Sequence, residues 1–335
     1  MKTIWVISEG SPGHICQSED LADALSDETE CRVVIVRGRE NIRGWLRSSV
    51  RFTMKICGGN VSDSFLSKVA DIEIPEDAGD PDLLICSGGK SVFAAKALSV
   101  KHDTPLVFIG ERKHFPAEWF HTVVSPVPEE NAEKIIDVEM IPTAVSPALI
   151  AEHGMPEKGL WCMIVGGASR SHHFRKSDWK ALARGMNVLA EREKIRWLLT
   201  TSRRTGTEAE MTLKETLNEE ILEDAIWWSE KPRRELYDFM ARSELLCVTQ
   251  DSVTMVTEAV SSGRPVVSIY PDEVIFASDS FLPAYFDRLE KNRRMMRMSA
   301  AGLKDAEIDV LGFNLLAEEI LHSVARELIK RLEWH

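Results

Sequence analysis

One arrangement recurs along this chain of 335 residues and constrains its fold more than any other feature. A short apolar segment runs into a loop of glycine and polar residues, and a segment of helical character follows the loop. The arrangement occurs at 3–26 and again at 160–191, so it is present in both halves. Repeated strand–loop–helix units form mostly parallel sheets with helices on both faces. The sequence therefore predicts an α/β fold of two doubly wound, Rossmann-like domains.

The clearest of these units lies at 245–269, where a polar turn links a buried strand to a helix at 252–262. Ser252 suits the N-cap of that helix, and Gly263 suits the left-handed residue that follows its end. A helix N-terminus aimed past the carboxyl end of a strand forms a site for an anion. Glu258, on the polar side of the helix, could accept both hydroxyls of a ribose. The alternative is that Glu258 is an ordinary solvated side chain.

Two more polar loops in the second half follow buried strands. GGASRSHHF at 166–174 follows a strand at 160–165, and TTSRRTG at 200–206 follows a strand at 195–199. Two arginines and four hydroxyls at one strand end are typical of a phosphate site, because arginine offers paired donors and hydroxyls offer more. The second half is therefore predicted to bind an anionic ligand.

The first half contains loops of the same kind. A loop at 8–17 joins the first strand to a helix at 18–26. Its glycines would let the backbone approach a ligand, and Ser11 and His14 would bring polar groups to it, although a plain tight turn is the alternative. The loop at 110–115, GERKHF, also follows a strand. Its polar groups suit a substrate cleft, and a solvated loop explains them equally well.

A basic segment at 42–56 suggests contact with a membrane surface. Arg43, Arg47, Arg51 and Lys55 are four residues apart and would align on one helix face, beside aromatic and aliphatic residues. A basic amphipathic helix can rest on an anionic bilayer. The alternative is a domain-surface helix whose basic side chains are simply solvated.

Composition excludes several classes of protein. The net charge of −12 argues against broad binding of nucleic acid, which needs a basic surface. No run approaches the ~20 apolar residues of a membrane span, and the N-terminal apolar run is too short for a signal peptide. The six cysteines are scattered without a C-x-x-C pair, which is typical of a reducing compartment. We expect a cytoplasmic protein that can lie peripherally at the inner membrane.

The segment 141–159 is the best candidate for a linker, because it contains three prolines and two glycines and has little periodicity. Beyond it, the tail at 308–332 has the pattern of one long amphipathic helix. The predicted parts are an acceptor-side Rossmann-like domain at 1–145, a linker at 146–158, a nucleotide-binding Rossmann-like domain at 159–310, and a C-terminal helix at 311–335 that packs back on the first domain.

Four of these stretches together resemble a known family. SEGSPGHICQSEDLADAL, GGASRSHHF, TTSRRTG and VTQDSVTMVTEAVSSGRPV look like the family named after the plant "elongated mitochondria" (ELM) fission factor, most of whose members are bacterial. The resemblance covers most of the chain. The helix at 252–262 is also similar to the nucleotide-binding helix of GT-B glycosyltransferases. The resemblance implies the GT-B architecture, in which a cleft separates two Rossmann-like domains.

The resemblance also implies roles for individual residues. The second domain would hold the diphosphate and ribose of a nucleotide-sugar donor through Gly166, Gly167, Ser169, Arg170, Thr201, Ser202, Arg203, Arg204, Ser252, Val253 and Glu258. The first domain would face the acceptor through Gly10, Ser11, Gly13 and Gln17. The adjacent histidines at 172–173 depart from the family pattern of one polar and one aromatic residue, which puts the fine contacts of that loop in doubt.

GT-B enzymes work without a bound metal, because helix dipoles and basic side chains stabilise the leaving diphosphate. We accordingly predict neither a metal nor a cofactor. An inverting transfer needs a base on the first domain, and the candidates are His14, Glu9 and Glu111. We rank His14 first, because a constrained turn would hold it and histidine titrates near neutrality. Glu9 could orient the loop instead. The alternative is that His14 only binds a substrate phosphate or caps the helix.

The leading functional hypothesis is a metal-independent glycosyltransferase that acts in the assembly of cell-envelope polysaccharide or lipopolysaccharide. It would use a nucleotide-sugar donor and a lipid-linked or saccharide acceptor. A sugar-nucleotide epimerase is the second hypothesis, and it needs no lipid acceptor. A non-catalytic scaffold or adaptor of the fission-family type is the third. The retained polar residues of the strand-end loops speak against a scaffold.

Overall fold

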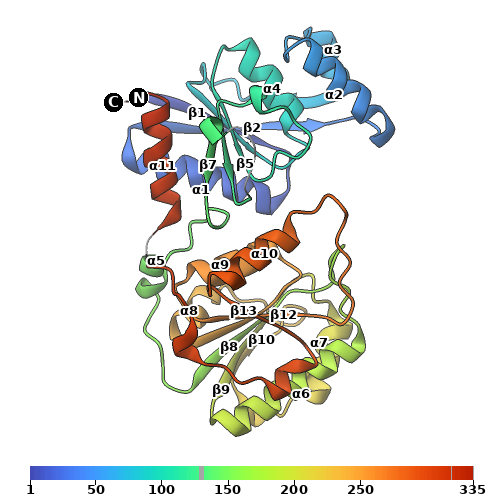
Figure 1. The fold of residues 1–335 in the computed structure, drawn as a ribbon, viewed down its shortest axis with the longest axis vertical. Coiled ribbons are helices and arrows are strands. Elements are labelled where there is room, and N and C mark those ends of the chain that lie inside the picture. The colour runs from blue at the N-terminus through green and yellow to red at the C-terminus, as the bar shows by residue number, and fades with distance from the viewer. Residues whose placement is uncertain (128–131, 318, 335) are drawn as a thin grey trace. The chain divides into compact units, whose positions relative to one another are not determined.

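The computed structural model describes residues 1–127, 132–317 and 319–334. It divides into two compact units, each built around its own sheet. Unit 1 comprises Met1–Ala144 together with Ile320–His335, and unit 2 comprises Val145–Glu319. The chain therefore builds most of unit 1, then all of unit 2, and ends with a helix that belongs to unit 1 (Figure 1).

The sheet of unit 1 has the strand order β3-β2-β1-β4-β5-β6-β7, and its neighbours are parallel except for β3, which runs antiparallel to β2. Its strands are β1 (Lys2–Ser8), β2 (Cys31–Glu40), β3 (Ala70–Glu73), β4 (Leu83–Ser87), β5 (Leu106–Ile109), β6 (Thr122–Ser125) and β7 (Ile135–Asp137). The central strand β4 is buried along its whole length. Such continuous apolar runs are typical of parallel strands that helices cover on both faces.

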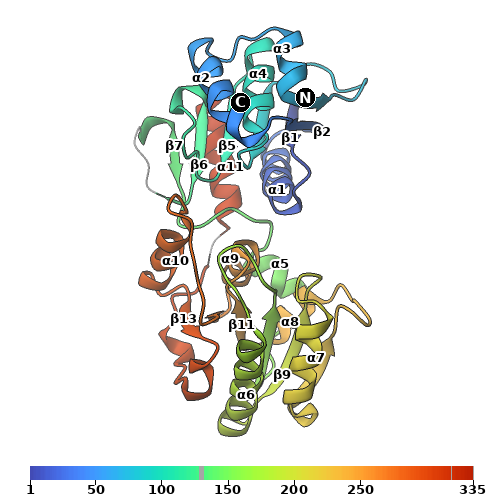
Figure 2. The same ribbon diagram turned by 90° about the vertical axis from the view of Figure 1, so that its right-hand side faces the viewer.

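Two layers of helices cover this sheet (Figures 1 and 2). On one face, α1 and α11 pack against each other and share an apolar cluster with the sheet. On the other face, α2, α3 and α4 share a second cluster with it. The helices are α1 (Pro12–Glu28), α2 (Arg47–Ile56), α3 (Asp63–Val69), α4 (Val92–Lys101) and α11 (Ile320–Arg331), with 3-10 turns η1 (Gly44–Leu46), η2 (Ala117–Trp119) and η3 (Ala132–Lys134).

The sheet of unit 2 has the order β10-β9-β8-β11-β12-β13, with every pair parallel. Its strands are β8 (Leu160–Val165), β9 (Arg196–Thr201), β10 (Leu222–Ile226), β11 (Leu245–Thr249), β12 (Val266–Tyr270) and β13 (Met296–Ser299). Helices α6 and α7 lie on one face, and α8, α9 and α10 lie on the other (Figures 1 and 2). The helices are α5 (Pro147–Glu152), α6 (Lys176–Glu193), α7 (Thr207–Thr216), α8 (Leu236–Arg242), α9 (Val253–Ser261) and α10 (Leu282–Lys291), with 3-10 turns η4 (Glu219–Ile221), η5 (Gly302–Asp305) and η6 (Val310–Gly312).

The predicted α/β fold of two doubly wound, Rossmann-like halves is confirmed. In each sheet the strand order reverses at the first strand of the unit. The next strands along the chain lie on one side of it, and later strands lie on the other side. The first strand is β1 in unit 1 and β8 in unit 2. Ligands of open α/β sheets bind beside the carboxyl ends of the strands at such a switch point. Each unit therefore has one position at which a site is expected.

Helix α1 corrects one prediction. It begins at Pro12 rather than at residue 18, so much of the expected loop at 8–17 is helical. Proline fits the first position of a helix because its fixed φ is helical and its missing N–H would have no partner there. His14 and Gln17 therefore lie on the first turns of a helix, and a constrained turn does not hold His14.

Two predictions about the chain between and beyond the domains also differ from the structure. The expected linker at 146–158 contains α5, whose N-cap is Ser146, and it belongs to unit 2. The tail at 308–332 is not one helix, because η6 and an irregular segment precede α11. In that segment the carbonyls of Asn314 and Leu315 accept hydrogen bonds from the Arg294 side chain. Those tertiary bonds satisfy backbone groups that a helix would have satisfied internally.

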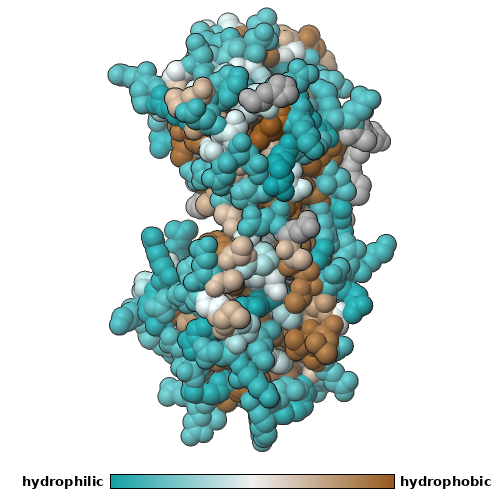
Figure 3. All heavy atoms as spheres, turned by 90° about the vertical axis from the view of Figure 1, so that its left-hand side faces the viewer, coloured by the Kyte–Doolittle hydropathy of each residue, from teal (hydrophilic) through white to brown (hydrophobic). Residues whose placement is uncertain are grey.

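Among the residues that the structure describes, no helix combines the length and the apolar character needed to cross a bilayer. The face drawn in Figure 3 is mostly hydrophilic, and its hydrophobic side chains lie in small separate groups.

Candidate functional site

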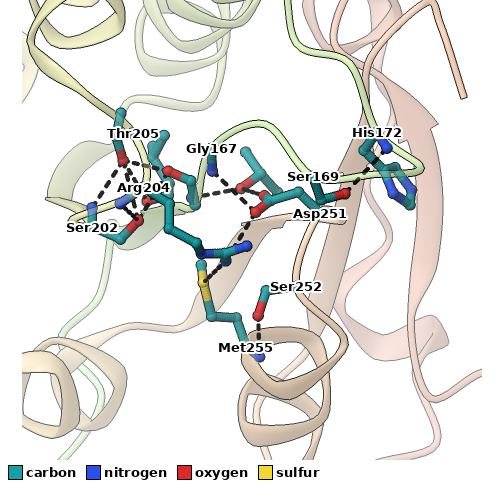
Figure 4. Close-up of polar contacts among 12 residues, drawn as sticks. Gly167, Ser169, His172, Ser202, Arg204, Thr205, Asp251, Ser252 and Met255 are labelled. Carbon is teal, nitrogen blue, oxygen red and sulfur yellow. Dashed lines mark hydrogen bonds and ion pairs between the residues drawn. The ribbon is translucent and has the colours of Figure 1, made fainter. Parts of the chain in front are cut away.

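The switch point of unit 2 gathers three of the predicted loops. Gly166 and Gly167 follow β8, and Ser202–Thr205 follow β9. The turn at 250–252 follows β11 and leads into α9. Because these strands are neighbours in a parallel sheet, the three loops leave it at the same edge. Figure 4 shows their polar side chains directed toward one another.

Asp251, to which the sequence analysis gave no role, connects the three loops. Its side chain is fully buried. One carboxylate oxygen accepts hydrogen bonds from the Gly167 N–H at 3.0 Å and from Arg204 Nη2 at 2.9 Å. The other accepts from the Thr249 hydroxyl at 2.7 Å. Burial raises the pKa of Asp251, against the opposing effects of the Thr249 hydroxyl and the Arg204 charge.

The amides of both glycines are already engaged. The Gly166 N–H donates to the Thr249 hydroxyl oxygen at 2.7 Å, and the Gly167 N–H donates to Asp251. Both amides are therefore bonded within unit 2, and the predicted contact of Gly166 and Gly167 with a diphosphate stays a prediction. Gly167 also has a structural role, because a Cβ there would lie 2.1 Å from the backbone carbonyl oxygen of Arg204. The loops after β8 and β9 thus pack backbone against backbone.

Hydroxyl groups lock the β9 loop to the end of β8. Ser202 Oγ donates to the carbonyl oxygen of Gly166 at 3.0 Å, and the Thr205 hydroxyl bonds the same oxygen. The Arg204 N–H in turn donates to Ser202 Oγ at 3.2 Å. The backbone at Arg204 is consequently fixed at both ends of a short turn.

Arg204 presents positive charge at the N-terminus of α9. Its guanidinium bridges Asp251 and Met255 Sδ, which lies 3.6 Å from Nη2, and its side chain remains 41% exposed. Ser252 caps α9 by accepting from the Met255 N–H at 3.4 Å. A guanidinium beside a helix N-terminus is an arrangement that favours phosphate. Of the features gathered here, this is the one best suited to bind a ligand.

The other predicted phosphate ligands divide into two groups. Arg170 and Arg203 are exposed and have no polar contact with any described residue, so both are open to solvent. Ser169 Oγ accepts from the His172 N–H at 3.1 Å. Thr201 is buried, and its hydroxyl is bonded to Glu210 and to the carbonyl oxygen of Ile226. The Thr201 hydroxyl is therefore used inside the unit.

The predicted ribose side of the site lies on α9. Val253 is the first residue of that helix, and Glu258 lies on it half-buried. Thr257, the residue before Glu258, faces inward, because its Oγ1 lies 2.7 Å from the Tyr285 hydroxyl. Only part of the polar side of α9 is therefore exposed to a ligand.

His172 is the second functional candidate that the sequence analysis did not assign. It is 1% exposed, and its ring nitrogens lie 2.9 Å from Ser171 Oγ and 3.3 Å from Gln250 Oε1. Burial lowers the pKa of His172, although the hydrogen bond with Gln250 opposes the shift. Gln250 directly precedes Asp251, so His172 supports the same turn. The unusual histidine pair at 172–173 was the signal that could have indicated it.

The lowered pKa of His172 predicts how stability depends on pH. The unfolded chain binds a proton near the ordinary histidine pKa of ~6.5, whereas the folded unit binds it only at lower pH. The free energy of unfolding of unit 2 should therefore decrease as the pH falls below about 6.5. His172→Gln should reduce that decrease in urea titrations at several pH values, whereas His173→Gln should leave it unchanged. Equal slopes in all three proteins would contradict the prediction.

In unit 1, the switch point brings together Glu9 and His14. His14 Nδ1 lies 2.7 Å from Glu9 Oε1, and the Lys90 N–H donates to Glu9 Oε2 at 3.0 Å. Burial alone would raise the pKa of Glu9, but the hydrogen bond with His14 and the charge of Lys90 outweigh it and hold that pKa below its usual range. Gly88 leaves the room for this pair, because a Cβ there would lie 2.2 Å from His14 Nδ1.

The remaining acceptor-side residues differ in their surroundings. Gln17 Oε1 accepts from the Ser87 hydroxyl at 2.9 Å, so it joins α1 to the end of β4. Gly10 has a φ of +85°, and Ser11 is the N-cap position of α1 without a side-chain cap. Gly13 lies inside α1. These residues adjoin the Glu9–His14 pair along the chain.

Glu111 follows β5 and is not part of that pair. The side-chain hydrogen bonds of Glu9 and His14 with described residues go to each other and to the Lys90 N–H. Within the described ranges, no group of three or more His, Cys, Asp or Glu side chains could hold a metal ion. The predicted absence of metal stays a prediction.

Comparison with known proteins identifies a family. The family model described as "Mitochondrial fission ELM1" matches residues 12–305 of this chain. Among curated proteins, no sequence matches it.

Solved structures resemble the chain over nearly its full length. The UDP-GlcNAc 2-epimerase from Methanocaldococcus jannaschii is 11% identical with a TM-score of 0.60, and each chain covers 100% of the other. The S. aureus MnaA–UDP co-structure is 12% identical with a TM-score of 0.53, over 99% of this chain and 89% of that one. The glycotransferase of kitacinnamycin is 12% identical with a TM-score of 0.54, over 99% and 95%. At such identities the likeness shows the fold alone, which is that of GT-B glycosyltransferases and epimerases.

Proposed function

This chain belongs to the mitochondrial fission ELM1 family, and on that premise we propose that it is a metal-independent glycosyltransferase with a nucleotide-sugar donor. Its acceptor would be a lipid-linked or saccharide intermediate of cell-envelope polysaccharide or lipopolysaccharide assembly. The protein would act in the cytoplasm, with peripheral contact to the inner membrane through 42–56. The observation that carries the proposal is the position of Arg204 at the N-terminus of α9.

In this proposal, unit 2 binds the donor. The diphosphate would lie against Arg204 and the first-turn amides of α9, beginning at Val253, which together stabilise the charge of the leaving group. Ser169, Arg170 and Arg203 would supply further donors from the flanking loops. Glu258 would accept the ribose hydroxyls. These groups favour a nucleoside diphosphate over a monophosphate, because they present several donors along one edge of the sheet.

Unit 1 would supply the base for the transfer. As the acceptor oxygen bonds to the anomeric carbon of the sugar, the bond from that carbon to the diphosphate oxygen breaks, and its electron pair leaves with the nucleoside diphosphate. The proton of the acceptor hydroxyl would pass to His14 Nε2. Glu9 favours this role, because its carboxylate beside Nδ1 keeps the proton of a neutral ring on that nitrogen.

Donor binding can be tested directly by a thermal-shift panel with UDP, GDP, CMP, ADP and their sugars. A ligand at ~100 times its Kd stabilises the folded protein by roughly 2.7 kcal/mol, which raises the Tm by several degrees. Glu258→Ala should weaken the binding of the active nucleotide by about 1–3 kcal/mol. Glu208→Ala, an exposed glutamate on α7, is the matched control. No shift with any nucleotide at millimolar concentration would favour the scaffold.

A sugar-nucleotide epimerase is the alternative that a specific observation favours. The epimerase from Methanocaldococcus jannaschii matches the whole chain with the TM-score of 0.60. The two activities differ in their second substrate, because an epimerase needs no acceptor. Incubation of the protein with the nucleotide sugar alone, followed by separation of the sugar epimers, would detect epimerisation. Conversion without an acceptor would replace the transferase proposal.

A further inference from the structure

One stretch of unit 1 has a charge opposite to that of the whole protein. The chain has a net charge of −12, yet 41–62 contains four basic residues and no aspartate or glutamate. Arg47 is neutralised within the unit, because its Nε lies 2.8 Å from Glu40 Oε2. Among the described residues, Arg43, Arg51 and Lys55 have no carboxylate partner. These three cations therefore remain for an external anion.

The same stretch exposes large apolar side chains. Trp45 is 75% exposed, Phe52 66% and Ile56 69%. Phe52 and Ile56 are one turn apart on α2, and η1, which contains Trp45, runs directly into that helix. Val50 and Met54, on the inner side of α2, are buried in the core of unit 1. We call Trp45, Phe52 and Ile56 the α2 outer face.

We propose that the α2 outer face, together with Arg43, Arg51 and Lys55, docks on the surface of an anionic lipid bilayer. Aromatic and aliphatic side chains can enter the headgroup region while adjacent cations pair with lipid phosphates. This location corrects the sequence-based hypothesis of one basic helix face. Arg43 precedes α2, and Arg47 belongs to the interior contacts of the unit. Arg51 and Lys55 lie on α2 beside Phe52 and Ile56 in the sequence, and Arg43 directly precedes η1, which contains Trp45.

The inner side of α2 connects this surface to the candidate base. Arg47 Nη2 donates to the carbonyl oxygen of Gly89 at 2.9 Å. The next residue, Lys90, donates its N–H to Glu9, which holds His14. The helix that meets the bilayer is thus bonded to the loop that positions the Glu9–His14 pair. The docking proposal rests on the proposed function and adds to it the class of the acceptor. The acceptor would be an amphiphile held in the membrane, with its hydroxyl-bearing head group presented to unit 1.

Vesicle sedimentation tests the docking surface. The full-length protein should sediment with vesicles of phosphatidylglycerol and phosphatidylcholine at low salt, and it should stay in solution with phosphatidylcholine alone. Arg43→Gln, Arg51→Gln and Lys55→Gln combined should weaken binding on the order of a hundredfold. Trp45→Ser, Phe52→Ser and Ile56→Ser combined should weaken it at least about tenfold. Five of the six residues are exposed, and Arg51 is half-buried with a 3.4 Å bond to Ser48 Oγ, so both variants should retain the wild-type Tm.

Matched controls separate this face from general surface effects. Lys158→Gln, Lys231→Gln and Lys304→Gln combined remove three exposed cations of unit 2, and Met155→Ser, Met211→Ser and Leu311→Ser combined remove three exposed apolar side chains. Both controls should sediment like the wild type. Wild-type protein that never sediments at low salt, or equal losses in the controls, would overturn the proposal. So would a change of the serine variant from dimer to monomer in sedimentation velocity, because a second copy would then cover the face.

The nucleotide panel distinguishes this proposal from the proposed function. Variants of the α2 outer face should lose vesicle binding and keep the thermal shift with the active nucleotide. Vesicle binding without any nucleotide shift would leave the docking surface standing and refute the glycosyltransferase. A thermal shift with a nucleotide but no vesicle binding would refute the docking surface and leave the glycosyltransferase proposal standing.

Discussion

Asp251→Ala should lower the free energy of unfolding of unit 2 by about 2–4 kcal/mol, because it leaves the buried Gly167 N–H and Thr249 hydroxyl without their acceptor. In a unit of this size, each kcal/mol corresponds to a Tm change of ~2–4 °C. The loss should also reach the ligand site, since the same carboxylate holds Arg204. We therefore expect at least about a tenfold rise in the Kd of the active nucleotide. Calorimetry and nucleotide titration measure the two effects separately.

Two further variants show whether Asp251 acts through the bonds it accepts. Asp251→Asn keeps the size of the side chain but only one of its two oxygen acceptors, so it should recover part of the stability that alanine loses. Asp305→Ala removes an exposed aspartate of the same unit and should change the unfolding free energy by less than ~0.5 kcal/mol. If Asp251→Ala is as stable as the wild type and binds nucleotide normally, the contacts of Asp251 do not organise the site.

Local signals explain why the helix at the centre of the site was predictable. Ser252 caps α9, and Gly263 has a φ of +73°, as the N-cap and C′ preferences indicated. The strands around it were also recognisable, because a parallel strand buried on both faces is a continuous apolar run. These features depend on residues only a few positions apart, so a single sequence contains them.

The role of Asp251 was not predictable in the same way. Its partner Gly167 is 84 positions away, and only the sheet order β8-β11 brings the two together.

Thr201 shows a second limit of prediction from the sequence. Successive side chains of a strand point to opposite faces, so the hydroxyls of TTSRR cannot all reach one ligand. The structure turns Thr201 toward Glu210 and Ser202 toward the β8 loop. Strand alternation could have separated them, but it could not have identified their partners.

The sequence-based predictions were also inaccurate at the ends of helices. Pro12 is compatible with a turn and with the first position of a helix, and the structure has the helix. The spacing of four between Arg43 and Arg47 predicted one face, but α2 begins only at Arg47. Arg47 then finds Glu40, a partner from the preceding strand. A periodic pattern alone does not show where its helix starts. For this reason the prediction placed all four basic residues on one helix face, which the structure does not have.

The largest expected effect on activity comes from His14. His14→Ala should reduce kcat by ~10²–10⁴ once donor and acceptor are known, since it removes the group that takes the proton of the acceptor hydroxyl. Donor affinity should stay unchanged, because the proposed donor ligands all belong to unit 2. His114→Ala, an exposed histidine in the loop after β5, is the matched control and should keep the wild-type kcat. A rise in KM at constant kcat would instead mark His14 as a binding residue.

Glu9→Gln separates the base from its positioning residue. The Glu9 side chain is 7% exposed, and both of its carboxylate oxygens are engaged, by His14 Nδ1 and by the Lys90 N–H. An amide cannot accept both bonds and carries no charge, so the ring of His14 would lose its fixed orientation. We expect a smaller loss of kcat than in His14→Ala, and little further loss when both substitutions are combined, because the two residues act as a unit. Additive losses would mean that Glu9 contributes independently of His14. Full activity in both variants would transfer the role of base to Glu111, the remaining candidate.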